Sequence, residues 1–186
     1  MAQIKGNLLL ARLKFLHEKA APDQVQSVLN QLTPECRRAV TGSILAVAWY
    51  PIEYVFELMA AMEQGMGQGS PRFVEELGRF SAQQAYRGLY KLFFKFGSPE
   101  FILKRCPMFW GQLMDSGKLD VTMSGPRQAN LGLTGFDQQL PKVFMRSLAG
   151  WSQGLMEVSG AKNVRVEILQ WPSPSNFNTV FSLHWD

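Results

Sequence analysis

The chain has few side chains that could act as nucleophile, base or metal ligand: Cys36, Cys106, His17 and His184. The cysteines form no CxxC pair and have no histidine nearby in sequence, so they do not predict a zinc site. Cys106 follows Arg105, a neighbour that would lower a thiol pKa, but a cysteine nucleophile also needs a base. No catalytic or metal centre is therefore predicted, and the reactivity of the two thiols is left open.

The acidic side chains do not predict acid–base chemistry either. Glu53 and Glu57 are four residues apart, and Glu75 and Glu76 are adjacent, but no histidine or metal-ligand spacing accompanies them. We interpret them as solvated carboxylates. The glycine-rich residues 65–69 lack the lysine and the preceding strand of a phosphate-binding loop. The sequence predicts a protein that is not an enzyme and names no cofactor.

Composition predicts a globular protein. Hydrophobic residues make up 46% of the 186 residues, and the net charge of +4 is spread over scattered basic residues without a nucleic-acid-binding motif. The apolar run at residues 8–11 is too short for a signal peptide or a membrane span, so a cytoplasmic location is expected. The 9 Met and 13 Phe residues could fill a core or line an apolar pocket.

Prolines mark the expected helices. Thr33-Pro34, Ser70-Pro71 and Ser98-Pro99 each place a capping hydroxyl before a proline at the first helical position. Pro107 should kink or split a helix. The predicted helices cover residues 4–19, 23–32, 34–49, 52–64, 71–96 and 99–115, with residues 65–69 as a flexible loop and Gly97 as a C-cap.

The long fifth helix carries a stripe of small residues at helical spacing. The stripe consists of Gly78, Ala82, Ala85 and Gly88. Small side chains allow another helix to pack closely, and they can also leave room for a ligand. Both interpretations are kept.

After Gly117 the hydrophobic period changes from 3.6 to 2, which indicates strands. Leu119, Val121 and Met123 alternate with polar residues, and three later segments around residues 131, 166 and 181 do the same. A helix from Pro141 to Gly160 separates the second and third strands. The predicted fold class is α+β, a single domain over 1–186. Its helical part (1–116) precedes a four-stranded antiparallel sheet in β-β-α-β-β order (117–186).

Several short motifs carry a family resemblance. The chain resembles an uncharacterised paralogous family expanded in myxobacteria, over nearly its whole length and in the same motif order: Ala48-Trp49-Tyr50-Pro51, Leu77-Gly78-Arg79, Gly88-Leu89-Tyr90, Ser98-Pro99 and Phe109-Trp110. No activity is assigned to that family, so the resemblance implies a bacterial source and little about function.

The element order also resembles a wider superfold. It comprises the haem nitric-oxide-binding domains, the four-vinyl-reductase-type small-ligand domains and the palmitate-holding subunits of vesicle-tethering complexes. This resemblance implies an apolar ligand between helices and sheet, and often a dimer. The haem-binding members use a proximal histidine and a Tyr-x-Ser-x-Arg motif, and this chain has neither, so haem binding of that kind is not expected.

Two functional hypotheses follow. The first is a non-catalytic sensor or carrier domain for a lipophilic small molecule held between helices and sheet. The candidate ligand-binding residues are Met59, Phe80, Ala85, Leu92, Met123, Leu131, Trp151 and Phe181. The second is a homodimeric protein-interaction module of a bacterial signalling assembly. Its interface would lie on exposed apolar residues: Leu9, Leu13 and Leu16, or Trp49 and Tyr50.

Overall fold

The computed structural model describes residues 2–87 and 98–186. The first part is mostly helical and contains β1 (Gln3–Lys5), α1 (Gly6–Lys19), α2 (Pro22–Asn30), α3 (Pro34–Thr41), β2 (Trp49–Pro51), α4 (Ile52–Met62), the π-helix η1 (Glu63–Gly67), α5 (Pro71–Arg87), α7 (Pro99–Leu103) and α8 (Cys106–Leu113). The second part contains β3 (Lys118–Gly125), β4 (Gln128–Thr134), α9 (Lys142–Val158), β5 (Arg165–Gln170) and β6 (Thr179–His184). The predicted mixed α+β class, with an antiparallel four-stranded sheet, is confirmed.

Two of the predicted helix caps are confirmed. Thr33 Oγ1 accepts a hydrogen bond from the Cys36 N–H, and Ser98 Oγ accepts one from the Phe101 N–H. The predicted break at Pro107 is confirmed as well, because the chain forms α7 and α8 rather than one continuous helix. The predicted continuation of the fifth helix to residue 96, and the cap at Gly97, lie outside the described residues.

Three predicted boundaries are wrong. The first helix begins at Gly6 because residues 3–5 form β1, which pairs antiparallel with β2. The third helix ends at Thr41 rather than at residue 49, because residues 49–51 are needed for that pairing. Residues 65–69 are not simply a loop, since η1 continues α4 through Gly67 before Gln68 turns left-handed at φ 48°.

The sheet has the spatial order β3-β4-β6-β5, with every neighbouring pair antiparallel. One inward row crosses all four strands in register: Val121 pairs with Leu131, Leu131 with Phe181, and Phe181 with Ile168. Leu131 and Phe181 are buried, whereas Asp120 on the other face of β3 is exposed. The period-2 pattern therefore places one face of the sheet on the core.

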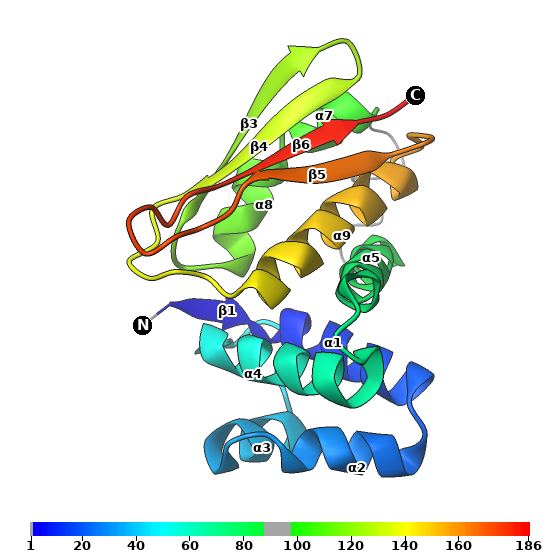
Figure 1. Ribbon diagram of the computed structural model, residues 1–186, viewed down its shortest axis with the longest axis vertical. Coiled ribbons are helices and arrows are strands. Elements are labelled where there is room, and N and C mark those ends of the chain that lie inside the picture. Colours follow the sequence, from blue (N-terminus) through cyan, green and yellow to red (C-terminus); the bar gives the residue numbers. More distant parts are fainter. Residues whose placement is uncertain (1, 88–97) are drawn as a thin grey trace.

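Figure 1 shows the described elements arranged in tiers. The sheet lies at one end, α8 and α9 lie beneath it, and α5 crosses next to α9. The helices α1 and α4 form the following tier, and α2 and α3 lie at the far end. None of the described helices combines the length and apolarity that spanning a membrane requires.

The crossing of α5 and α9 depends on glycines. A Cβ on Gly78 would overlap the backbone of Ser147, and a Cβ on Gly150 would overlap the backbone of Glu75. Gly154 lies similarly close to α5, where a Cβ would be 2.9 Å from the Arg79 carbonyl oxygen. The two helices are therefore in direct backbone contact. Gly78 lies in this contact, and Ala82 is fully buried. Of the two interpretations of the small-residue stripe, the structure therefore supports close helix packing for these two residues.

This packing gives a testable expectation. Gly150→Ala should lower the free energy of unfolding by about 1–3 kcal/mol, because the backbone of α5 cannot move away from the new methyl without shifting the whole crossing. Gly111→Ala is the matched control: Gly111 is exposed in α8 and has no atom near its Cβ position. It should be neutral or stabilise by up to about 1 kcal/mol. Urea denaturation measures both, and equal effects of the two substitutions would contradict the close crossing.

Candidate functional site

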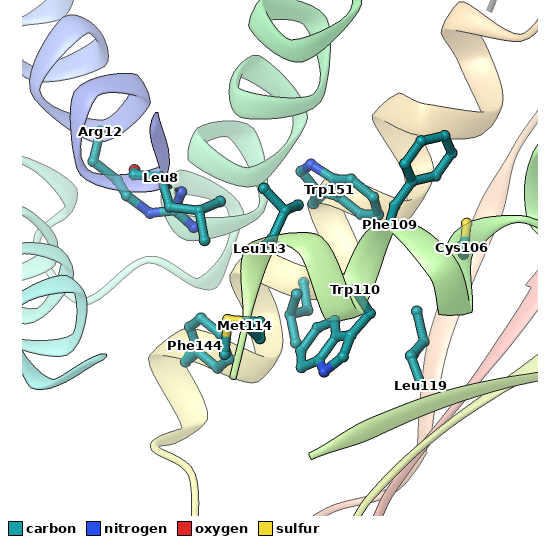
Figure 2. Close-up of a pocket in the computed structure, with 11 residues that line it drawn as sticks. Leu8, Arg12, Cys106, Phe109, Trp110, Leu113, Met114, Leu119, Phe144 and Trp151 are labelled. Atoms are coloured by element: carbon teal, nitrogen blue, oxygen red, sulfur yellow. Dashed lines mark hydrogen bonds between the residues drawn. The ribbon is translucent and has the colours of Figure 1, made fainter. Parts of the chain in front are cut away.

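A small apolar cavity lies beneath the sheet, enclosed by α1, α8, α9 and the start of β3. Its volume is about 40 Å³, which is room for roughly three water molecules. Figure 2 shows the side chains that line it. They are Leu8, Arg12, Cys106, Phe109, Trp110, Leu113, Met114, Leu119, Phe144, Leu148 and Trp151.

A larger groove adjoins this cavity. It has a volume of about 510 Å³, within the range of roughly 300–1,000 Å³ typical of small-molecule sites. Leu8, Phe109, Leu113 and Trp151 line both spaces, so the cavity and the groove share these side chains along their common border. The remaining lining comes from the start of the chain, the segment before β2, α5, α8 and α9: Lys5, Asn7, Leu10, Ala11, Lys14, Ala46, Val47, Ser81, Gln84, Ala85, Gln112 and Leu155.

The β1 strand fixes the walls of the cavity relative to each other. Ile4 of β1 forms a bridge with Met114 just after α8, and the Asp115 N–H donates to the Gln3 carbonyl at 3.1 Å. The Gln3 N–H in turn donates to Asp115 Oδ1 at 2.6 Å. Because α1 begins directly after β1, these bonds hold the first turns of α1 beside the end of α8.

Among the described residues that line the cavity, Arg12 is the one that carries a charge. It is only 4% exposed, and within the described residues its one hydrogen bond runs from Nη1 to the Leu8 carbonyl oxygen at 3.0 Å. Its Nε–H is buried without a partner, and no carboxylate of residues 2–87 or 98–186 pairs with it. Residues 88–97 contain no Asp or Glu.

This environment shifts the titration of the guanidinium. Burial lowers the pKa of Arg12 from 12.5 to about 10, because the charged form loses its hydration without gaining an anionic partner. A pKa near 10 still leaves the side chain protonated at neutral pH. The cavity therefore contains a positive charge that no described carboxylate compensates.

Sequence reasoning overlooked Arg12, although a signal was present. Leu9, Arg12 and Leu16 recur at spacings of three and four and so share one face of α1. Leu9 and Leu16 are fully buried. The prediction that they form an exposed interface is therefore wrong, and the same helical stripe carries Arg12 into the interior.

The two thiols are held in their protonated form. Burial raises the pKa of Cys106, a cavity residue, to about 12. The expectation that Arg105 lowers it is wrong, because the Arg105 guanidinium lies over the Phe101 ring, 3.5 Å from its centroid. Burial, with a smaller contribution from Glu57, also raises the pKa of Cys36 to about 12. The fraction of thiolate at neutral pH is negligible for both.

We therefore expect both thiols to resist modification in the folded protein. With Ellman's reagent at pH 8, native Cys36 and Cys106 should react at least roughly 100-fold more slowly than in guanidinium, because only local or global unfolding exposes them. Rapid reaction of one thiol in native buffer, with no loss of secondary structure, would contradict the burial described here.

Two of the predicted ligand-binding residues meet at the groove. Ala85 of α5 and Trp151 of α9 both line it, and Trp151 also lines the small cavity. The small-residue stripe is thus divided, since Ala85 borders open space while Gly78 and Ala82 pack against α9.

The other predicted residues lie elsewhere. Met59, Leu131 and Phe181 are packed in the core, with 0%, 3% and 2% of their surface exposed. Phe80 is partly buried and contacts Phe15 edge-on, with ring centroids 5.3 Å apart. Met123 packs against the core from β3. Leu92 lies outside the described residues.

The remaining polar groups do not converge. Glu57 accepts hydrogen bonds from the N–H and hydroxyl of Thr33, at 3.0 and 2.8 Å, and so supports the start of α3. One oxygen of Glu53 accepts from Gln138 at 3.4 Å. Both histidines are exposed. In the part of the chain that the structure describes, no group of three or more His, Cys, Asp or Glu could hold a metal ion.

Structural comparison identifies the fold. A variant of the Tt H-NOX protein superposes with a TM-score of 0.75 at 13% identity, covering 98% of this chain and 95% of that one. An H-NOX protein from K. algicida gives a TM-score of 0.72 at 10% identity, with 98% and 97% covered. An oxygen-binding H-NOX domain related to soluble guanylate cyclases gives 0.70 at 12%, with 98% and 95% covered.

These matches confirm the predicted resemblance to the haem-NO-binding fold. No protein-family model matches the chain, and no curated protein does. At 9–13% identity the likeness concerns the fold alone.

The residues of this cavity do not suit a haem. Neither histidine of the chain lines the cavity or the groove. The one cysteine in the lining, Cys106, has its pKa raised to about 12 by burial, so it is a thiol and not a thiolate. Aromatic side chains occupy the space between α8 and α9, and Trp110 is held by a 3.2 Å hydrogen bond from Nε1 to the Ser116 carbonyl. The 40 Å³ that remains is far too small for a porphyrin.

Proposed function

We propose that this chain is a non-catalytic sensor or carrier domain that binds a lipophilic small molecule in the groove between α1, α5, α8 and α9. The observation that carries the proposal is the groove itself: about 510 Å³, lined largely by Leu, Ala, Val, Phe and Trp side chains, and continuous in its lining with the cavity around Arg12. The proposal treats residues 1–186 as one cytoplasmic domain.

The fold supports this assignment by analogy. Solved structures of the same fold include an H-NOX domain described as oxygen-binding and a protein in which porphyrin distortion modulates the haem redox potential. Small-molecule binding is therefore associated with this architecture, although a shared fold does not fix a shared ligand. Here the aromatic and thiol lining does not suit haem, whereas an apolar site between the helices is present.

The proposed ligand site therefore lies in the groove between the helices and not against the inward face of the sheet, where the sequence predicted it. The inward sheet residues Leu131 and Phe181 serve as core, whereas Ala85 and Trp151 border the groove. Of the predicted ligand-binding residues, these two are the ones through which we propose that ligand contact occurs.

A lipophilic dye tests the proposal. Nile red, which is neutral, should bind the native protein in a saturable way with increased fluorescence, and Ala85→Trp should weaken that binding at least roughly 10-fold by filling the groove. Ala60→Trp is the matched control, since Ala60 is exposed on α4 and does not line the groove. It should leave binding unchanged. Absence of saturable binding, or equal loss in both variants, would refute the groove as a site.

A second function is favoured by an apolar surface that includes Val47 and Leu10 at one edge of the groove. Val47, Leu45, Trp49 and Leu10 are 76%, 65%, 42% and 39% exposed. Exposed large apolar side chains near one another often mark a protein interface. We infer as the alternative a homodimeric interaction module that uses this surface.

Sedimentation equilibrium separates the two functions. If the surface forms a dimer, the protein should dimerise at micromolar concentration and Leu45→Asp should shift it to monomer, because a carboxylate would be desolvated at the interface; Leu45 does not line the groove. A strict monomer at high concentration would exclude the dimer and leave the ligand-binding function.

A further inference from the structure

The buried guanidinium of Arg12 makes no described polar contact that joins two elements of the fold. Its one described hydrogen bond, to the Leu8 carbonyl, lies within its own helix. A buried charge without a partner destabilises a folded protein, and replacing such a charge by an apolar side chain of similar size is often stabilising. The unpaired guanidinium of Arg12 therefore destabilises the protein on its own. A bound anionic partner, which the described chain does not supply, would remove this cost.

The geometry around Arg12 indicates what that partner is. Elsewhere in the structure, Arg79 binds the Glu157 carboxylate with its Nε and Nη2 atoms, at 2.8 Å each. This bidentate edge is the arginine surface that best fits a carboxylate. In Arg12, the hydrogen bond to Leu8 uses Nη1, and Nε is unpartnered.

The space around Arg12 sets the size of the partner. The cavity of about 40 Å³ has room for a small group such as a carboxylate. Beyond Leu8 and Leu113, which line both spaces, the groove of about 510 Å³ is mostly apolar. Figure 2 shows Arg12 reaching from α1 toward Leu8 and Leu113 at this border.

We propose that the ligand is an amphipathic carboxylic acid of the fatty-acid type, whose carboxylate pairs with Arg12 in the cavity while its alkyl chain passes Leu8 and Leu113 into the groove. This inference rests on the proposed function and adds the chemical class of the ligand. The site therefore selects an acid over a neutral molecule of the same length, because only the acid neutralises the buried charge.

The acid and the alcohol of one chain length provide the test. Isothermal titration of the wild-type protein with dodecanoate and with dodecan-1-ol should show tighter binding of the acid by about 10–100-fold, the range expected for a desolvated charge-assisted pair. In Arg12→Met the acid should lose this preference while the alcohol binds as before. In Arg12→Lys, which keeps the charge but not the bidentate edge, part of the preference should remain.

Two controls separate this role from a structural one. Lys142 is exposed at the start of α9 and lines neither the cavity nor the groove, so Lys142→Met removes a positive charge from the protein without touching the site. It should retain the preference for the acid within about threefold, since an exposed charge contributes little. The ligand-free Arg12→Met protein should melt about 2–8 °C higher than wild type, because it no longer buries an unpartnered charge.

The outcomes are distinct. Equal binding of acid and alcohol by the wild type, or an acid preference that survives Arg12→Met, overturns the role of Arg12 and leaves the proposed function standing. Loss of the preference in Lys142→Met alone also overturns it. Failure of the wild type to bind either molecule or Nile red overturns the proposed function as well. If Arg12→Met does not fold, Arg12 is structural and the inference is wrong.

Discussion

The backbone contact between α5 and α9 is the constraint on which the candidate site depends. Gly78, Gly150 and Gly154 let the two helices touch without intervening side chains, which fixes the angle and separation at which they leave the crossing. On one side of the crossing, α9 covers the sheet. On the other side, Ala85 of α5 and Trp151 of α9 border the groove together with α1 and α8. A side chain at the crossing would move all of these walls.

The interior of the molecule has two parts. One is a well-packed apolar core, and the other is the cavity around Arg12, where a buried polar atom has no hydrogen-bond partner among the described residues. The row of side chains across the sheet includes the buried Leu131 and Phe181, and many residues of α1 and α4 are fully buried as well. Around Arg12 the packing differs, because a protonated guanidinium, a buried thiol and four aromatic side chains surround a small void. Natural cores seldom keep such a charge without a partner, which is why we propose this position as a ligand site. The chain thus combines the H-NOX fold with a lining that does not suit haem.

Much of the fold could be predicted from local patterns. Alternation in residues 119–123 and 181–185 predicted strands, and the Ser98-Pro99 and Pro107 signals predicted the ends of α7 and α8, because each depends on neighbours along the chain. The three-residue strands β1 and β2 could not be predicted, since a pairing between residues far apart in sequence, such as Ile4 with Tyr50, leaves no local period. The π-helix η1 could not be predicted either, because its conformation depends on packing with the surrounding elements and not on a local sequence pattern.

The candidate site was less accessible to sequence reasoning. Ala85 and Trp151 were predicted to border a ligand and do border open space, but Arg12 was missed, because arginine is rarely buried and its helical stripe was assigned to the surface. The stripe of Leu9, Arg12 and Leu16 contained the necessary information, yet only the packing of α1 against α4 and α5 shows which side of the helix is inside.

One measurement tests the central claim most directly. A crystal structure of the protein grown with 12-bromododecanoate should show a bromine anomalous peak in the groove and the carboxylate within hydrogen-bonding distance of Arg12 Nε. A peak confined to the molecular surface, or a groove and cavity with no bound acid at saturating concentration, would contradict a lipophilic ligand site in this fold.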